Sequence, residues 1–395
     1  MTLTDEERRV LGLIDESDLV ALTQELVRVP GENPPGEEAA TAAALAGAAR
    51  VRGLSVETDD AAPGRPNLVV TLEGSAGPGL LLLGHTDVVP AGPGWTGEPF
   101  SGELSDGRIH GRGSTDMKGG LAACLVAMDA VRRAGVEPRG PVLLAALVDE
   151  EDTGLGIHHH VAHASTPPLA GCIVAEPTDL QTVIAARGDS YLDYRVRGRA
   201  AHAGSPSDGR NAIVGASRII SDLQEWHEAL AATAHPLAGP ATVSVGTISG
   251  GQGTSIVAAD CHLTVDRRLL PSESPDDVLA EARTRLDALD LARDDLEVEL
   301  TLAMAMPGFD TGADEPWVRL VDTAVADAGG PGLPLGGWTA ACDGGFIAET
   351  GTPVVVLGPG SVSEQAHRAD ESVAVSELVT AARAYALSIV RLPGH

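Results

Sequence analysis

Short hydrophobic runs recur along the chain, and most of them are unbroken instead of alternating with polar residues. They lie at residues 67–72, 80–84, 142–148, 171–175 and 353–358. Unbroken runs of this length are typical of central strands that are covered on both faces of a sheet. Segments with helical spacing separate them, and this order predicts an α/β domain whose mixed, mainly parallel sheet is covered by helices.

The predicted helices follow from hydrophobic residues three or four positions apart. Near the N-terminus Leu19, Leu22 and Leu26 have this spacing, and Pro30 ends the run. Ser17 is the candidate cap of this helix. Further helices are expected at residues 37–52, 119–133 and 317–328.

The order of predicted strands and helices changes between Arg187 and Met304. This segment predicts a strand, a helix, two strands, a helix and a strand, at residues 190–198, 211–230, 241–250, 261–269, 275–289 and 296–304. The β-α-β-β-α-β order is the ferredoxin-like arrangement. We therefore expect a second domain at 187–304, inserted into a first domain that is formed by 1–186 and 305–395.

The composition is that of a globular protein, but the chain is strongly acidic. Its 395 residues include 27 Lys and Arg against 56 Asp and Glu, which gives a net charge of −29. Such a field repels the phosphates of nucleic acids and anionic membrane surfaces, so we expect neither as a partner. No hydrophobic run approaches the roughly 18 residues of a membrane span.

The N-terminal residues and the cysteines predict a cytoplasmic protein. The charged N-terminal segment lacks the hydrophobic region of a secretion signal. The cysteines lie far apart and form no CxxC pair, which favours reduced thiols over a disulfide framework. They are Cys124, Cys172, Cys261 and Cys342.

Lysine and asparagine are so scarce in this chain that the positions where they occur stand out. Lys118 is the one lysine, against 26 arginines, and the asparagines are Asn33, Asn67 and Asn211. A chain that uses these types so little keeps them where a position requires them. These four positions are therefore candidates for specific contacts.

Histidine and acidic residues follow the predicted strands. They are His85, Asp87, Glu150, Glu151, Glu176 and His367, and Asp116 precedes the helix at 119–133. Because ligands bind at the carboxyl ends of strands in open α/β sheets, we expect these side chains to converge. Each alone has an ordinary explanation, such as a satisfied histidine or an acidic first turn of a helix. Together they form a nitrogen and oxygen donor set that suits zinc or cobalt. Two ions sharing one carboxylate need five ligands, and Glu150 is then left as a candidate general base.

Six motifs recur in order over nearly the whole chain. They are GHTDVVPAG (84–92), GRGSTDMKGG (111–120), DEEDTG (149–154), AEPT (175–178), GRAAHAGSPSDGRNAI (198–213) and GPGSVSEQAH (358–367). Together they resemble the di-zinc aminoacylase and carboxypeptidase family, which includes acetylornithine deacetylase, succinyl-diaminopimelate desuccinylase and glutamate carboxypeptidase. In that family the inserted domain is a lid over the catalytic domain.

The resemblance implies a role for each matching residue. One zinc ion would be bound by His85, Asp116 and Glu176, and the other by Asp116, Glu151 and His367. Glu150 would be the base that deprotonates water and then the acid that protonates the leaving amine. Asp87 would hold the ring of His85.

The lid would contribute three further residues. His202 would stabilise the oxyanion, and Arg268 would bind the substrate carboxylate through its planar fork. Asn211 either contacts the substrate or caps the helix that it opens. In dimeric relatives the lids pair and the histidine matching His202 reaches the partner's active site, so we expect a homodimer here.

Two positions depart from the family pattern. Ser255 stands in the stretch where the family usually has an asparagine, and Gly345 stands where desuccinylases usually carry an arginine. Without that arginine, the second carboxylate of a succinyl group would lack a cation.

The implied function is a metal-dependent amidohydrolase that removes the acyl group from an N-acyl amino acid, nearest to acetylornithine deacetylase. A desuccinylase, a carboxypeptidase or a dipeptidase on the same di-zinc scaffold is the alternative. The implied cofactors are two divalent ions, with zinc foremost and cobalt or manganese as alternatives, and the substrate would be a small N-acyl amino acid or a short peptide. A non-catalytic relative should have lost a ligand or Glu150, and this chain retains them all.

One dense histidine run lies outside these motifs. His158, His159, His160 and His163 follow DEEDTGLG. We expect them on an exposed helix with some affinity for stray metal and no part in catalysis.

Overall fold

The computed structural model describes residues 2–164 and 166–393, and the chain forms two compact units. The first unit comprises Met1–Ile184, Thr311–Gly336 and Phe346–His395. The second comprises Ala185–Asp310 and Gly337–Gly345. The short segment 337–345 thus belongs to the inserted unit, whereas the sequence had suggested the first domain for it.

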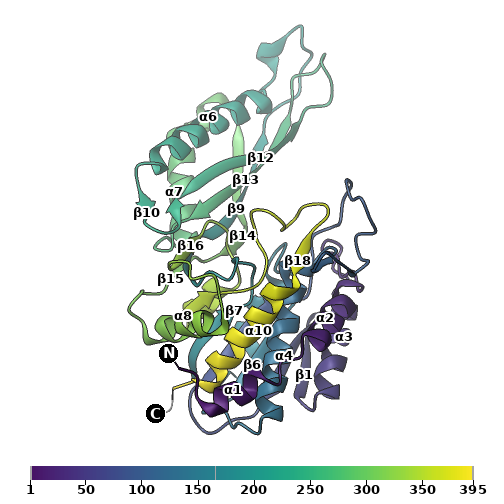
Figure 1. Ribbon diagram of the computed structural model, residues 1–395. Coiled ribbons are helices and arrows are strands. Elements are labelled where there is room, and N and C mark those ends of the chain that lie inside the picture. Colours follow the sequence, from purple (N-terminus) through teal and green to yellow (C-terminus); the bar gives the residue numbers. More distant parts are fainter. Residues whose placement is uncertain (1, 165, 394–395) are drawn as a thin grey trace. The chain divides into compact units, whose positions relative to one another are not determined.

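The first unit is built on a mixed sheet (Figure 1). Its strands are β1 (Ser55–Ala62), β2 (Arg65–Leu72), β3 (Gly79–His85), β6 (Val142–Leu147), β7 (Leu169–Val174), β17 (Val354–Val356) and β8 (Val183–Ala186), which crosses the unit boundary. They are ordered β1-β2-β6-β3-β7-β17-β8. The central β6, β3, β7 and β17 are parallel, and the flanking pairs are antiparallel. The predicted α/β fold with a mixed sheet is confirmed.

The central strands are hydrophobic on both faces because both faces are covered. Every residue of β3 and of β6 is buried. Alternate residues of β2 point to opposite faces of the sheet. Leu68 and Val70 belong to the core that includes Leu45 of a covering helix. Asn67 and Val69 line a cavity on the opposite face.

The helices of the first unit are α1 (Asp5–Leu11), α2 (Glu16–Val27), α3 (Ala39–Val51), α4 (Gly119–Arg133), α5 (Leu155–His163), α8 (Pro316–Ala328) and α10 (Val375–Val390), with α9 (Gly344–Ala348) starting in the second unit. Figure 1 shows α2, α4 and α10 packed beside one another. The cap of α2 is Asp15, whose carboxylate accepts from the main-chain N–H groups of Ser17 and Asp18. The expected cap, Ser17, is therefore wrong by two positions.

Several short elements complete the unit. They are the π-helical turn η1 (Ser114–Lys118) and the strands β18 (Ser372–Ala374), β5 (Arg108–His110) and β4 (Glu103–Ser105), which form a small separate sheet in that order. Because η1 leads directly into α4, it fixes the position of Asp116 against the buried start of that helix.

The second unit follows the β-α-β-β-α-β order. Its main elements are β9 (Gly188–Arg197), α6 (Ala212–Leu230), β12 (Thr242–Gly250), β13 (Asp260–Leu269), α7 (Pro275–Ala288) and β14 (Glu297–Met306). The four strands form an antiparallel sheet in the order β12-β13-β9-β14. Trp226 and Ile219 of α6 pack on Tyr194 and Leu263 of the sheet.

Smaller elements of the second unit are η2 (Pro206–Asp208), β10 (Ala234–His235), β11 (Gly239–Pro240), η3 (Leu291–Asp294), β15 (Phe309–Asp310) and β16 (Gly336–Trp338), which begins in the first unit.

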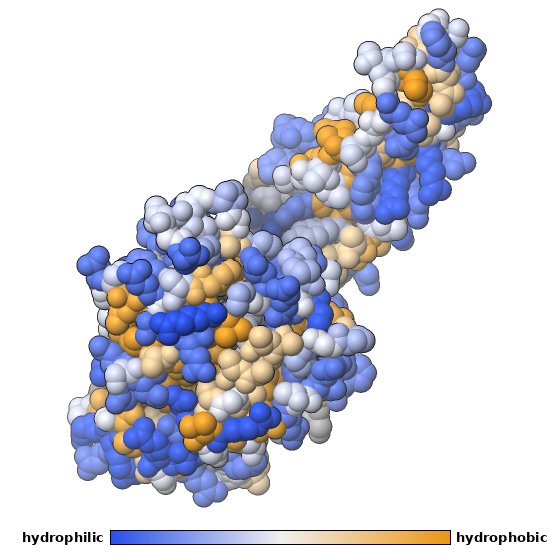
Figure 2. Space-filling view, turned by 90° about the vertical axis from the view of Figure 1, so that its right-hand side faces the viewer, coloured by the Kyte–Doolittle hydropathy of each residue, from blue (hydrophilic) through white to orange (hydrophobic). Residues whose placement is uncertain are grey.

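Figure 2 shows the hydropathy of one face of the molecule. On the face shown in Figure 2, hydrophilic residues predominate and hydrophobic ones are interspersed among them. Among the described residues, none of the helices has the length and apolar character that a membrane span requires.

Candidate metal centre and active site

The five predicted metal ligands all lie in the first unit, and four of them follow parallel strands. His85 is the last residue of β3, and Glu176 lies two residues beyond β7. Glu151 lies in the loop after β6, and His367 lies in the loop between β17 and β18. Asp116 lies in η1. The parallel order of β6, β3, β7 and β17 brings these strand ends to one edge of the sheet.

The five side chains form two groups that share Asp116. Nε2 of His85 lies 3.3 Å from Oδ1 of Asp116 and 3.2 Å from Oε1 of Glu176. Nε2 of His367 lies 3.4 Å from Oδ2 of Asp116 and 3.0 Å from Oε2 of Glu151. In each group the candidate donor atoms lie within 4.8 Å of one another. Asp116 offers a different oxygen to each group, which is the arrangement of a bridging carboxylate.

The orientation of His85 is fixed from behind the site. Its Nδ1 lies 3.0 Å from the main-chain carbonyl of Asp87. A carbonyl oxygen only accepts, so Nδ1 carries the proton and Nε2 faces the two carboxylates. The Asp87 carboxylate lies farther away, at 3.5 Å from Nδ1. We expected the Asp87 side chain to orient the imidazole of His85, but the main-chain carbonyl of Asp87 makes the shorter contact.

The electrostatics of the cluster suit divalent cations. Burial and the charge of Asp116 raise the pKa of Glu176 to about 7, and the same two causes raise the pKa of Glu151. Burial alone would also raise the pKa of Asp116, but hydrogen bonds from His367 and His85 hold it well below its usual range. Three buried carboxylates therefore crowd together with only two imidazoles to compensate them. The donor set of nitrogen and oxygen atoms without sulfur fits two divalent metal ions.

The sequence profile of "Peptidase family M20/M25/M40" matches residues 81–391. The chain belongs to this family. It is 32% identical over 336 residues to the acetylornithine deacetylase of Aliivibrio fischeri (strain ATCC 700601 / ES114), an alignment that covers 82% of this chain and 84% of the relative. It is also 35% identical over 388 residues to the succinyl-diaminopimelate desuccinylase of Methylobacterium sp. (strain 4-46), covering 91% and 92%.

Solved structures of the M20 family share the fold. An M20 family metallo-carboxypeptidase from Sulfolobus solfataricus superposes with a TM-score of 0.80 at 19% identity, covering 94% of this chain and 99% of that one. A tripeptidase from Staphylococcus aureus gives a TM-score of 0.76 at 23% identity, covering 96% and 99%. With the curated relatives, these matches identify the chain as a metal-dependent hydrolase of amide bonds.

The M20 motif that carries Glu150 and Glu151 is held by the Asp87 carboxylate. That carboxylate accepts hydrogen bonds from the main-chain N–H of Glu150 at 3.3 Å and of Glu151 at 3.1 Å. It also accepts one from the side-chain amide of Asn33 at 3.0 Å. Although burial opposes it, hydrogen bonding by His85 and Asn33 lowers the pKa of Asp87. Asp87 thus stays ionised and fixes the backbone next to the candidate metal ligands.

Asn33 extends this network to the other end of the loop. The same amide nitrogen donates to Asp149 at 2.9 Å, and Arg65 lies 2.8 Å from that carboxylate. Arg65 is also paired with the buried Glu38. The scarcity of asparagine had marked position 33, but nothing in the sequence identified its partners.

Two further buried groups hold η1. The sequence did not predict Glu371, and it marked Lys118 only by the scarcity of lysine. The carboxylate of Glu371 accepts from the main-chain N–H of Thr115 at 2.9 Å and of Asp116 at 3.1 Å, and Arg112 pairs with it at 2.6 Å. Nζ of the fully buried Lys118 donates to the carbonyl of Pro30 at 2.8 Å. The single lysine therefore joins η1 to the segment that leads to Asn33.

In the second unit, His202 presents one ring nitrogen to its surroundings. It is exposed, and its Nδ1 accepts the main-chain N–H of Gly204 at 3.0 Å. An N–H group only donates, so Nδ1 is unprotonated and Nε2 is the ring's donor when the histidine is neutral.

Asn211 caps α6, which was one of its two expected roles. Its side-chain oxygen accepts from the main-chain N–H of Ile213 at 3.0 Å and of Val214 at 3.3 Å. The capping contact by itself accounts for an asparagine at this position.

Arg268 is already paired within the second unit. Its Nε and Nη2 bond to Asp266 at 3.0 and 2.9 Å, and Nη2 lies 3.0 Å from Asp189. Burial raises the pKa of Asp189 to about 7, against the opposing charge of Arg268. The acidic residues thus contact Nε and Nη2 of the guanidinium, and no described acidic residue contacts Nη1.

Gly345 has a steric reason to lack a side chain. A Cβ placed there would lie 1.8 Å from the carbonyl oxygen of Pro307. The arginine that desuccinylases usually carry at this position cannot be accommodated on this backbone.

Proposed function

We propose that this protein removes the acyl group from an N-acyl amino acid, and that an acetyl group is preferred. The observation that carries the proposal is the shared carboxylate of Asp116 between two ligand groups, with Glu150 directly beside the ligand Glu151. Relatives named acetylornithine deacetylase and succinyl-diaminopimelate desuccinylase support this substrate class.

The cofactors in this proposal are two divalent metal ions, with zinc foremost. One ion would be held by His85, Asp116 and Glu176, and the other by Asp116, Glu151 and His367. When bound, such ions supply Lewis acidity, which polarises the scissile carbonyl and makes the attacking water more acidic.

Glu150 is the proton carrier of the proposed reaction. Its backbone is held through Asp87, whereas its side chain is not needed to complete either ligand group. The carboxylate accepts a proton from the attacking water and later donates it to the amine nitrogen as the C–N bond breaks. The second proton of the water also passes to the amine, so the acyl group leaves as a carboxylate and the amino acid leaves with an ammonium group, and atoms and protons balance.

His202 and Arg268 recognise the substrate in this proposal. With Nδ1 engaged by the backbone of Gly204, Nε2 of a neutral His202 carries the proton that an oxyanion needs. Nη1 of Arg268 offers a donor to the α-carboxylate, while Asp266 and Asp189 keep the rest of the guanidinium in place. Asn211 contributes by ordering the start of α6.

We also propose a homodimer that pairs through the second unit, acting as a lid. β12 is an edge strand of its sheet and is largely exposed. Exposed hydrophobic side chains lie on β12, at the start of α6 and at Ile256, which forms an isolated β-bridge with His202. They are Ile248 (52% exposed), Val214 (57%), Ile213 (41%) and Ile256 (41%). A second copy would cover this edge and these side chains.

The cytoplasm is the proposed location, because the four cysteines are free and buried. The acidic surface favours small molecules over nucleic acids as partners.

A hydrolysis panel tests the proposed function. Purified enzyme is given N-acetyl, N-succinyl and N-formyl derivatives of the same amino acids, together with dipeptides, and kcat/KM is compared. We expect N-acetyl substrates to be hydrolysed fastest, because Gly345 leaves no cation for a second carboxylate. A tenfold or larger preference for N-succinyl substrates would show that the desuccinylase alternative is correct, and fastest cleavage of dipeptides would favour a dipeptidase.

A further inference from the structure

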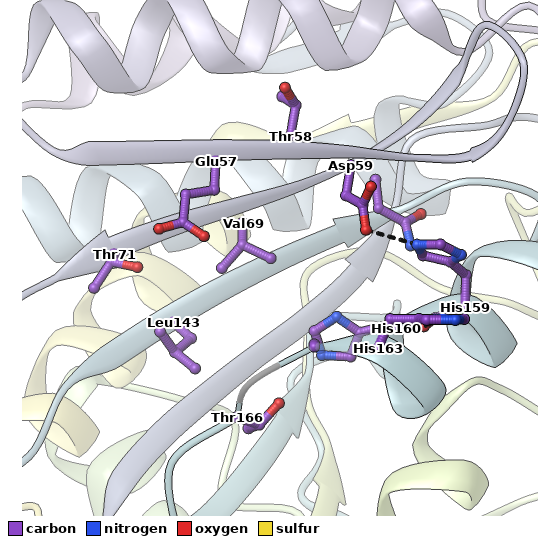
Figure 3. A pocket seen from close by; sticks show the side chains of 12 residues that line it. Glu57, Thr58, Asp59, Val69, Thr71, Leu143, His159, His160, His163 and Thr166 are labelled. Atoms are coloured by element: carbon purple, nitrogen blue, oxygen red, sulfur yellow. Dashed lines mark hydrogen bonds and ion pairs between the residues drawn. The ribbon is translucent and has the colours of Figure 1, made fainter.

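A cavity of about 390 Å³ lies between α5 and the face of the sheet formed by β1 and β2, and none of the five active-site ligands lines it. Figure 3 shows this cavity, with Glu57 and Asp59 on β1 and three histidines on α5. No lysine or arginine is among the residues that line it. The wall therefore offers carboxylates and imidazoles, which suit a cation and do not suit an anion.

Two of the histidines and one carboxylate are already in contact. Nε2 of His159 lies 2.7 Å from Oδ2 of Asp59, the pair joined by a dashed line in Figure 3. The rings of His159 and His163 are stacked with their centroids 4.4 Å apart. Residues four positions apart lie on the same face of a helix, so the backbone of α5 itself keeps these two imidazoles together.

In the neutral ring of His163, as the structure orients it, Nε2 is the nitrogen that can bind a metal ion. Its Nδ1 lies 3.0 Å from the main-chain carbonyl of His159. The carbonyl can only accept, so Nδ1 carries the proton and Nε2 keeps its lone pair. A carbonyl behind the ring is also the usual outer partner of a metal-bound histidine.

His160 supplies an independent sign that the cavity takes a ligand. We expected the whole histidine run to be exposed, but the His160 side chain is buried, with only 6% of the residue accessible. Its Nε2 has no hydrogen-bond partner among the described residues, and the residue lines the cavity. A buried polar atom without a partner is costly, and a ligand or an ordered water in the cavity would relieve that cost.

We propose that this cavity binds one divalent transition-metal ion, zinc above all, through His159, His163 and Asp59. Imidazole nitrogen with carboxylate oxygen is a donor set that zinc prefers. The ion would replace the proton that His159 shares with Asp59. Among the described residues, the two candidate ligand groups of the active site have all their donor atoms within 4.8 Å of one another. The donor atoms of His159, His163 and Asp59 do not all lie this close together, so binding would require the exposed side chains of His163 and Asp59 to move.

Binding here would connect α5 to β1. The helix begins at Leu155, just after the loop that carries Glu150 and Glu151, and it packs against β1 and β2. An ion held by Asp59 on the strand and by two side chains on the helix would therefore fasten one end of the active-site loop to the edge of the sheet. This inference is independent of which acyl group the enzyme removes.

Zinc binding to the full-length protein tests the proposal. Protein stripped with a chelator is dialysed against increasing Zn²⁺, and bound zinc per chain is measured by elemental analysis for wild type, His163→Ala and Asp59→Asn. We expect each variant to bind one ion fewer than wild type at concentrations that saturate wild type. Loss of a residue that binds the ion directly should lower the zinc affinity of this site by more than the roughly 10–100-fold that loss of an outer hydrogen-bond partner costs.

His158→Ala is the matched control, because it removes a neighbouring imidazole of α5 whose ring lies against Phe346 instead. It should bind as much zinc as wild type. The amidase activity of all three variants, assayed with saturating metal, reports that they are folded. Equal zinc content in wild type, His163→Ala and Asp59→Asn would overturn the proposal, as would an equal loss in His158→Ala. Because the readout is a difference between variants, it does not depend on how many ions the active site holds.

Discussion

In the candidate metal centre, two residues each contact two different neighbours. Asp116 directs one oxygen to His85 and the other to His367, so one side chain defines both ligand groups. Asp87 uses its main-chain carbonyl for His85 and its carboxylate for the backbone of Glu150 and Glu151. A substitution at either position would therefore disturb both halves of the site together.

Glu150 is the residue whose loss should separate proton transfer from metal binding. Glu150→Gln keeps the size of the side chain and removes its basicity. We expect the variant to retain the divalent ions of wild type, because neither ligand group includes Glu150, and to lose about 10²–10⁴-fold in kcat. Elemental analysis and steady-state kinetics on the same preparation check this. Near-normal turnover would assign the base elsewhere, and loss of metal would make Glu150 a ligand.

The convergence of the candidate ligands could be predicted from the sequence because each follows a hydrophobic run or opens a helix. Parallel pairing of those runs is enough to bring their ends together. Their support could not be predicted in the same way. Asn33 meets partners 54 and 116 positions away, and Glu371 meets Asp116 across 255 positions. Such pairings depend on the folded backbone and leave no local pattern.

At the scale of elements, hydrophobic periodicity predicted the buried central strands. It did not predict an exposed edge strand or a helix that is buried on nearly all sides. β1 is mostly exposed and carries Glu57, Asp59 and Asp60, as suits an edge strand that must not pair with another chain. The hydrophobic pattern predicted no strand there. It also proposed no helix at α10, whose buried residues occupy nearly its whole circumference and so give little amphipathic contrast.

The loop at 149–154 is an element whose position should depend on Asn33. Asn33→Ala removes the donor shared by two buried carboxylates, at a cost of about 1–3 kcal/mol in the free energy of unfolding. It also removes a hydrogen bond that positions the Asp87 carboxylate, which holds the backbone of Glu150, and a displacement of about 1 Å can cost ~10²-fold in rate. We therefore expect a fall in kcat that exceeds any rise in KM.

Asp15→Ala is the matched control for the Asn33 variant. It removes the cap of α2, which costs about 0.5–2 kcal/mol, and Asp15 makes no described contact with the 149–154 loop. Both variants should unfold at lower denaturant, but only Asn33→Ala should lose turnover. An equal loss of kcat in the two would mean that Asn33 contributes stability alone.

At the scale of the whole molecule, the two units carry different parts of the proposed chemistry. The first holds all five candidate ligands and Glu150, and the second holds His202, Asn211 and Arg268. In the proposed function both parts act on one substrate, and closure around it would exclude water. The exposed hydrophobic side chains near His202 add a reason to expect that two copies take part.

Mixing two inactive variants tests whether His202 acts across a dimer. Glu150→Gln and His202→Ala should each be nearly inactive as homodimers, because each lacks one catalytic group at every site. If each site combines Glu150 of one subunit with His202 of the other, a mixed dimer contains one site with both groups intact. Random reassortment makes half of the dimers mixed, so co-expressed variants should regain about a quarter of wild-type activity. Light scattering on the same samples establishes the mass. A dimer that shows no recovery would place His202 in the site of its own chain, and a monomer would remove the basis for sharing.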